Sequence, residues 1–152
     1  ASNIIPETAR VGFSFRYYEP RYTTGIRERS ARIVENVAAA YGCTSSLVQD
    51  LRLDPVYNDE GASALARGSA QKLFGKDCLI SAPAWAACES MGSYLSMVPG
   101  CLAFVGIRNE AVGSGGLHHN PLFDIDEEVL PACTALHIQV ALDTLQSEGE
   151  LT

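Results

Sequence analysis

Hydrophobic and polar positions alternate near the start of the chain, over residues 8–18 (TARVGFSFRYY). Branched and aromatic side chains share one face and small or polar ones the other, which predicts a half-buried strand. Over residues 21–42 apolar side chains recur every three or four positions with arginines and glutamates between them, and Gly42 follows. This spacing predicts an amphipathic helix closed by glycine. Alternation returns over residues 45–53 and predicts a second strand.

Strand, helix and strand together predict one layer of an α+β sandwich. Two strands are too few to complete a stable sheet. An unpaired strand edge is also a template for association with another strand. We therefore expect this layer to pair with another part of the chain or with another chain.

The pattern changes after residue 54. Residues 60–75 and 88–98 carry apolar side chains at helical spacing. Residues 101–107 (CLAFVGI) form a continuous apolar run bounded by turn residues, which predicts a strand buried on both faces. Helical spacing returns over residues 127–147. The second part is thus expected to be a separate α/β unit, and the fold class of the chain is α/β (α+β).

Length and charge narrow the function classes. A chain of 152 residues with 47% hydrophobic and 19% charged residues is long and apolar enough for a globular core. Its net charge of −7 disfavours nucleic acid as a partner, because phosphate binding needs clustered lysine and arginine. No apolar run approaches the roughly 18 residues of a membrane span. The first residues do not form a secretory signal.

The cysteines point to a reducing compartment. There are five, an odd number, and none forms a C-x-x-C pair. Each lies in or beside an apolar or small-residue segment, where a free cysteine behaves as a small hydrophobe. We therefore expect reduced, buried thiols in a cytoplasmic protein.

A glycine-rich stretch, residues 113–128 (GSGGLHHNPLFDIDEE), separates the last predicted strand from the last predicted helix. His118 and His119 stand side by side in it, and the proline after them favours extended backbone, so we expect a loop. Asp124 and Asp126 lie at helix-start distance from the next apolar run, where a carboxylate caps free backbone N–H groups. Capping explains these acids better than metal binding does. The sequence thus predicts a histidine held rigidly before a capped helix.

The same stretch resembles a known family. The pattern L-H-x-N-P-x-F-D-x-D-E-E-x-L-P, read over residues 117–131, resembles the C-terminal signature of M20 metallopeptidases. Its nearest match is the amidohydrolase branch of aminoacylase-, hippurate-hydrolase- and auxin-conjugate-hydrolase-like enzymes. Residues 3–16 resemble a strand of the family's lid or dimerisation domain, and residues 54–59 its crossing into the catalytic domain. Residues 89–110 resemble a fourth motif, so the similarity is collinear over almost the whole chain.

This resemblance implies a domain organisation and a chemistry. Residues 1–53 would be the second half of the lid or dimerisation domain, and residues 54–152 the C-terminal part of a zinc-peptidase-like catalytic domain. The complete enzyme would hydrolyse the amide bond of N-acyl amino acids or similar small substrates with two divalent metal ions, zinc or manganese. His119 matches a ligand of that metal centre.

The resemblance assigns further residues to the substrate, and each has an ordinary structural alternative. Arg16 would recognise a substrate carboxylate, or else be a solvated strand arginine. Asn3 is a weaker match in the same segment. Glu89 would help to shape the metal site or the substrate pocket, or else be a helix-start acid. His118 is expected to be structural or exposed, and His137 to be a hydrogen-bonded helix residue.

Two departures from the family pattern bear on activity. The family's N-terminal catalytic segment, with the other metal ligands and the catalytic glutamate, has no counterpart in these residues. The family's Gly-x-Glu-Asp-Phe reads Ala-Cys-Glu-Ser-Met over residues 87–91. We therefore expect this chain alone to bind metal weakly and to be inactive, and to form a homodimer or to pair with a complementary N-terminal segment. The alternative is a non-catalytic dimerisation or interaction module.

Overall fold

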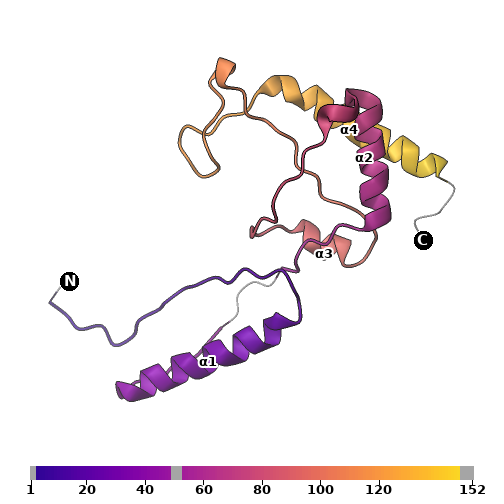
Figure 1. Cartoon of the computed structure of the whole chain (residues 1–152). Helices are drawn as coiled ribbons and strands as arrows, with labels where there is room; N and C mark the ends of the chain where they lie inside the picture. Colours follow the sequence, from indigo (N-terminus) through magenta and orange to yellow (C-terminus); the bar gives the residue numbers. More distant parts are fainter. Residues whose placement is uncertain (1–2, 49–52, 148–152) are drawn as a thin grey trace. The chain divides into compact units, whose positions relative to one another are not determined.

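A computed structural model describes residues 3–48 and 53–147 of the chain. The chain divides into two compact units, which are described separately. Unit 1 consists of Ala1–Pro55 and Trp85–Cys88, and unit 2 of Val56–Ala84 and Glu89–Thr152. The described residues form four α-helices and three short 3₁₀ helices (Figure 1).

Unit 1 is built on helix α1, Tyr22–Ala40. At its start, the Thr23 hydroxyl donates a hydrogen bond of 2.8 Å to the carbonyl of Pro20. At its end, Gly42 has a φ of 69°, and the N–H of Cys43 reaches back to the carbonyl of Ala38 at 2.9 Å. This pairing is a Schellman motif, which satisfies the last carbonyls of a helix. The predicted helix and its closing glycine are confirmed.

The predicted strand over residues 8–18 is wrong. The segment is irregular and carries no strand assignment. Its alternating side chains are exposed: Val11 at 82%, and Phe13 and Phe15 at 52% each. Alternation describes side chains that suit a sheet, whereas a strand exists only where a neighbour accepts its backbone hydrogen bonds. The described part of unit 1 contains no neighbouring strand that could accept these hydrogen bonds. The second predicted strand fails in the same way at residues 45–48, and residues 49–52 lie outside the described residues.

Unit 2 begins with helix α2, Glu60–Phe74. Asp59 caps it, since its Oδ1 accepts a hydrogen bond of 2.8 Å from the N–H of Ala62. The 3₁₀ helix Lys76–Cys78 follows. Helix α3, Met91–Leu95, is shorter than the predicted 88–98, because glycine and serine in this stretch are weak helix formers.

The last helix, α4, spans Leu130–Gln146 and follows the 3₁₀ helix Glu127–Val129. A proline lies in its first turn, where a missing N–H costs least. The third 3₁₀ helix is Glu110–Val112. Helices α2 and α4 therefore confirm the two long helices predicted for the second part of the chain.

The predicted buried strand at residues 101–107 is also wrong. Its residues are half-buried or exposed, and none belongs to a strand. The Asn58 side chain takes the place of a neighbouring strand at Leu102: it accepts from the N–H at 2.8 Å and donates to the carbonyl at 3.0 Å. One side chain cannot supply all the hydrogen bonds that a neighbouring strand would make along residues 101–107. The α/β fold class is thus not confirmed, and the regular structure of the described residues is helical.

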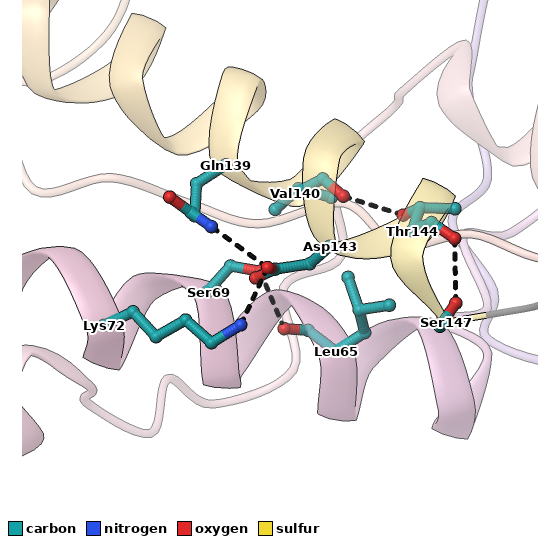
Figure 2. A network of polar contacts seen from close by, with 8 residues as sticks. All are labelled: Leu65, Ser69, Lys72, Gln139, Val140, Asp143, Thr144 and Ser147. Carbon is teal, nitrogen blue, oxygen red and sulfur yellow. Dashed lines mark hydrogen bonds and ion pairs between the residues drawn. The ribbon is translucent and has the colours of Figure 1, made fainter.

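Helices α2 and α4 pack against each other through a polar cluster (Figure 2). Ser69 is fully buried, and its hydroxyl donates to Asp143 Oδ2 at 2.6 Å. Asp143 Oδ1 accepts from Lys72 Nζ at 2.7 Å and from the Gln139 amide at 3.0 Å. The hydrogen bond from Lys72, followed by that from Ser69, holds the pKa of Asp143 below its ordinary value.

Burial in the described residues is sparse and mostly polar. Among the described residues, Ala70 is the only buried hydrophobic residue, and Ser69, Ser114 and Asp143 are buried polar residues. The expected burial of the cysteines is wrong, because Cys43, Cys78 and Cys88 are exposed and Cys101 and Cys133 are half-buried. The thiols form no disulfide among these described positions. Across residues 3–48 and 53–147, none of the helices combines the length and apolar character needed to cross a membrane.

Candidate functional site

The predicted histidine loop, defined here as residues 115–123, is formed by two successive turns. The N–H of Asn120 donates to the carbonyl of Leu117 at 3.2 Å, which closes the first turn. The N–H of Phe123 donates to the carbonyl of Asn120 at 2.9 Å, which closes the second. The Asn120 side chain also accepts from the N–H of Leu122 at 2.9 Å. Asn120 therefore joins the two turns at the residue that precedes the proline.

The two arms of the histidine loop touch at Gly116. A Cβ placed on Gly116 would overlap the carbonyl group of Leu122 and lie 2.9 Å from the N–H nitrogen of Phe123. Any side chain at position 116 would force the arms apart, so the close approach requires glycine. The glycine-rich composition of this stretch thus has a steric cause at this position.

His119 has a left-handed backbone conformation, with a φ of 63°. Among the described residues, His119 is the only non-glycine residue with a positive φ. This region costs an L-residue about 1–2 kcal/mol. Such residues persist where the surrounding structure over-determines them, and they cluster at functional sites. The two turns and the Gly116 contact supply that constraint.

His118 has a different environment. Its ring lies edge-on to Phe123, with 5.1 Å between the ring centroids and 60° between the planes. It borders an open pocket of about 180 Å³. The pocket is lined by residues of the loop and by residues just before and after it: Ile107, Arg108, Gly115, Gly116, Leu117, His118, Phe123 and Asp124. His118 is exposed and contacts the Phe123 ring, which agrees with the expected structural or exposed histidine.

The base of the histidine loop is closed by a network around Asn109 and Asp126. The Asn109 amide donates to Asp126 Oδ2 at 2.7 Å, and the N–H of Asp126 donates to the carbonyl of Ile107 at 3.0 Å. Asn109 and Ser114 exchange backbone hydrogen bonds of 3.1 Å in both directions. The buried Ser114 hydroxyl also accepts from the N–H of Asn109 at 2.7 Å. The loop therefore starts and ends on one fixed base.

Known proteins that are similar to this chain in sequence include hydrolases and deacetylases. IAA-amino acid hydrolase ILR1-like 6 of Arabidopsis thaliana is 27% identical over 143 residues, covering 91% of this chain and 31% of that protein. N-acetyldiaminopimelate deacetylase of Priestia megaterium is 28% identical over 120 residues, covering 79% of this chain and 31% of that protein. Thermostable carboxypeptidase 1 of Saccharolobus solfataricus is 25% identical over 142 residues, covering 92% and 35% respectively.

The resemblance to M20-type amidohydrolases is confirmed. The chain spans about a third of the length of the curated relatives it matches. No family model matches the chain. The names of these three relatives describe a hydrolase, a deacetylase and a carboxypeptidase.

The described residues do not by themselves fit the metal centre that this resemblance implies. In the part of the chain that the structure describes, no three histidine, cysteine, aspartate or glutamate side chains gather closely enough to hold an ion. A catalytic metal needs about three protein ligands, and His119 supplies one. Further ligands would have to come from beyond the described residues.

The other predicted site residues lie in both units. Glu89, in unit 2, accepts hydrogen bonds from the N–H of Met91 at 3.2 Å and from the Ser90 hydroxyl at 3.3 Å, so it behaves as a helix-start acid. Arg16 and Asn3 belong to unit 1 and are exposed; the Arg16 guanidinium donates to the neighbouring Phe15 carbonyl at 3.2 Å. Their substrate-binding roles stay predictions.

Two further expectations are tested by local contacts. His137 Nδ1 lies 3.0 Å from the carbonyl of Cys133, one turn earlier in α4, as expected of a hydrogen-bonded helix histidine. Asp126 Oδ1 accepts from the N–H of Glu128 at 3.1 Å, so Asp126 caps the 3₁₀ helix that precedes α4, as predicted. Asp124 Oδ1 accepts instead from the N–H of the adjacent Ile125 at 2.8 Å, so its predicted capping role is not confirmed.

Sequence reasoning missed the network that closes the loop. Ser114 and Asn109 carry no chemical signature, and their pairing depends on the tight turn between them. A signal existed in Gly113, whose φ of 81° ends the 3₁₀ helix and returns the chain towards Asn109. The polar cluster of Figure 2 had a signal too, since Asp143 is an acid among the apolar positions of α4.

Proposed function

We propose that this chain serves as part of a two-metal amidohydrolase that cleaves the amide bond of N-acyl amino acids or similar small substrates. The observation that carries the proposal is the left-handed backbone of His119 on a loop that two turns and a glycine contact hold in place. His119 would be one ligand of a centre of two divalent ions, zinc or manganese. The remaining ligands and the catalytic acid–base group would come from outside the described residues.

The names of the relatives support the substrate class. One relative is named as a hydrolase of an amino-acid conjugate and others as deacetylases of N-acetylated amino compounds. Such substrates carry a carboxylate, which a guanidinium can bind through two parallel hydrogen bonds. Arg16, with a smaller part for Asn3, is our proposal for that contact, and Glu89 for the substrate pocket.

Substitution of the two adjacent histidines tests the proposal in the complete protein. His119→Ala should lower hydrolysis of N-acetyl amino acids by at least about 100-fold, since outer partners of a metal already contribute 10–100-fold. It should also lower the metal content measured by mass spectrometry. His118→Ala is the matched control and should leave metal content unchanged. Full metal content and activity in His119→Ala would overturn the proposal.

A second function, a non-catalytic dimerisation or interaction module, is favoured by one observation. Large apolar side chains in unit 1 are exposed on the extended segment and on one side of α1. Surfaces of this kind mark interaction sites. We propose that unit 1 associates with a second copy of the chain or with a complementary N-terminal segment. This function is compatible with the first and becomes the sole one if the complete protein hydrolyses no N-acyl amino acid.

A further inference from the structure

A side-chain hydrogen bond joins the two ends of the segment that carries His119. The Asn109 amide and the Asp126 carboxylate meet at 2.7 Å although they are 17 residues apart in the sequence. His119 lies between them, in the orange segment of Figure 1 that precedes α4. The bond therefore spans the histidine loop at its base, below the contact at Gly116.

Each partner of this bond is itself fixed to the backbone. Asn109 Oδ1 accepts from the N–H of Ala111 at 3.1 Å, which orients the amide so that its nitrogen faces Asp126. Asp126 Oδ1 accepts from the N–H of Glu128 at 3.1 Å, which leaves Oδ2 for Asn109. Each side chain thus uses one atom to hold its own backbone and the other to hold its partner. The 109–114 turn and the start of α4 are linked rigidly.

The left-handed backbone of His119 needs such a link. Its conformation is disfavoured for an L-residue and is kept only while the loop around it is constrained. The two turns and the Gly116 contact constrain the backbone inside the loop. All three are weakened if the two arms of the loop separate at its base.

We infer that Asn109 and Asp126 are positioning residues for His119, acting by closing the base of the histidine loop. The inference rests on the proposed function for its catalytic meaning, because it explains how the one predicted ligand is presented. The side chains of Asn109 and Asp126 bond to each other and to backbone N–H groups, so the two residues act on His119 through the backbone.

An exchange of the two side-chain types separates this role from general stability. Asn109→Asp keeps the acceptor for Ala111 but sets a second carboxylate against Asp126, so the bond is replaced by repulsion. The double variant Asn109→Asp/Asp126→Asn restores a donor–acceptor pair with the roles reversed. Both acceptors that hold the backbone are kept in the double variant.

The first measurement is made on the intact chain by NMR. Asn109→Asp should abolish the coupling and chemical-shift signature of positive φ at His119, and should speed amide exchange at Phe123 at least about tenfold, as expected when a local unit opens. The double variant should restore both. Asn36→Asp is the control: its amide donates to the Arg32 carbonyl within α1, far from the loop in the sequence.

Two results would overturn the inference. One is an unchanged positive φ at His119 in Asn109→Asp. The other is a double variant that folds, as judged by circular dichroism, without recovering the φ signature. Because this readout needs neither metal nor substrate, it is independent of the proposed function. A failure of hydrolysis in the complete wild-type protein would remove the proposed function and leave the loop result standing.

Discussion

The two adjacent histidines are both exposed, but they differ in backbone conformation and in contacts. His118 lies edge-on to the Phe123 ring, whereas His119 has a left-handed backbone. The left-handed conformation costs about 1–2 kcal/mol, and the loop contacts offset that cost. Presentation of His119 is therefore built into the chain before any ligand binds.

At the residue scale, the environment of Cys101 gives a prediction about thiol reactivity. Burial raises the pKa of the Cys101 thiol, while Arg67 opposes the shift and Asp59 adds to it. The thiolate is the nucleophile, so a raised pKa slows alkylation near neutral pH. Cys101 should react with iodoacetamide several-fold more slowly at pH 8 than the exposed Cys43 and Cys78.

Mass spectrometry of tryptic peptides measures these rates. The difference should shrink as the pH is raised towards 10, because the thiolate fraction of Cys101 then increases. In urea all cysteines should react alike, which is the control for sequence effects. Equal rates for Cys101 and Cys43 in the folded chain would contradict the prediction.

The residue-scale features differ in how far they could be predicted. Glycine and proline predict a loop at the histidines, and the acids before α4 predict a cap, because both effects act within a few residues. The positive φ of His119 could not be predicted, because only a few per cent of non-glycine residues have positive φ, even though histidine is enriched among them. It arises from contacts such as that between Gly116 and Leu122, which depend on the folded loop.

At the element scale, α2 and α4 are joined by an ion pair and hydrogen bonds. The Asp143 carboxylate is the centre of this cluster, and its partners Lys72 and Ser69 both lie on α2 (Figure 2). A carboxylate at a helix–helix contact makes the contact dependent on pH. The sign of that dependence follows from its lowered pKa.

A folded-state pKa below the ordinary value means that ionised Asp143 stabilises the folded chain. This contribution is fully present above the ordinary carboxyl pKa of about 3.9, and it is lost as the pH falls through the lowered folded-state value. Asp143→Asn should therefore lower the free energy of unfolding at pH 7 and weaken its decline below about pH 4.

Urea unfolding followed by circular dichroism at several pH values measures this effect. Glu110→Gln is the matched control, because Glu110 forms an exposed ion pair with Arg108 and such pairs contribute little. The prediction fails if Asp143→Asn and Glu110→Gln change the pH dependence equally.

Helices were predictable from the sequence and strands were not, for one physical reason. The hydrogen bonds of α1, α2 and α4 lie within each helix, so local periodicity is enough to place them within a few residues. The hydrogen bonds of a strand are made with a neighbouring strand. Neither the alternation over residues 8–18 nor the apolar run over residues 101–107 can supply that neighbour. These segments keep the side-chain pattern of strands without the pairing.

At the scale of the whole molecule, the described residues bury little apolar surface for a chain of this length. Ala70 is their buried hydrophobic residue, whereas a 152-residue globular chain normally encloses a sizeable core. The two strands predicted in residues 1–53 indicated an incomplete sheet. The sequence did not predict that the helices would also leave apolar faces exposed. On α1, Ile33, Val37 and the following Tyr41 are spaced four residues apart and all are exposed.

The final prediction concerns association through the extended segment of unit 1. Phe13 and Phe15 pack edge-on at 5.4 Å and expose about half of their surface, and Val11 continues the same alternating face. Burying one phenylalanine contributes about 1.5–3 kcal/mol, and each 1.4 kcal/mol is tenfold in Kd. Phe13→Glu should therefore weaken self-association, or binding of a complementary polypeptide, by at least about tenfold. Ser14→Glu adds the same charge at the intervening position without removing a phenylalanine, and should have a smaller effect. Sedimentation velocity across a range of concentrations measures both variants. A wild-type chain that stays monomeric at high concentration, with no second polypeptide in the sample, would contradict the prediction.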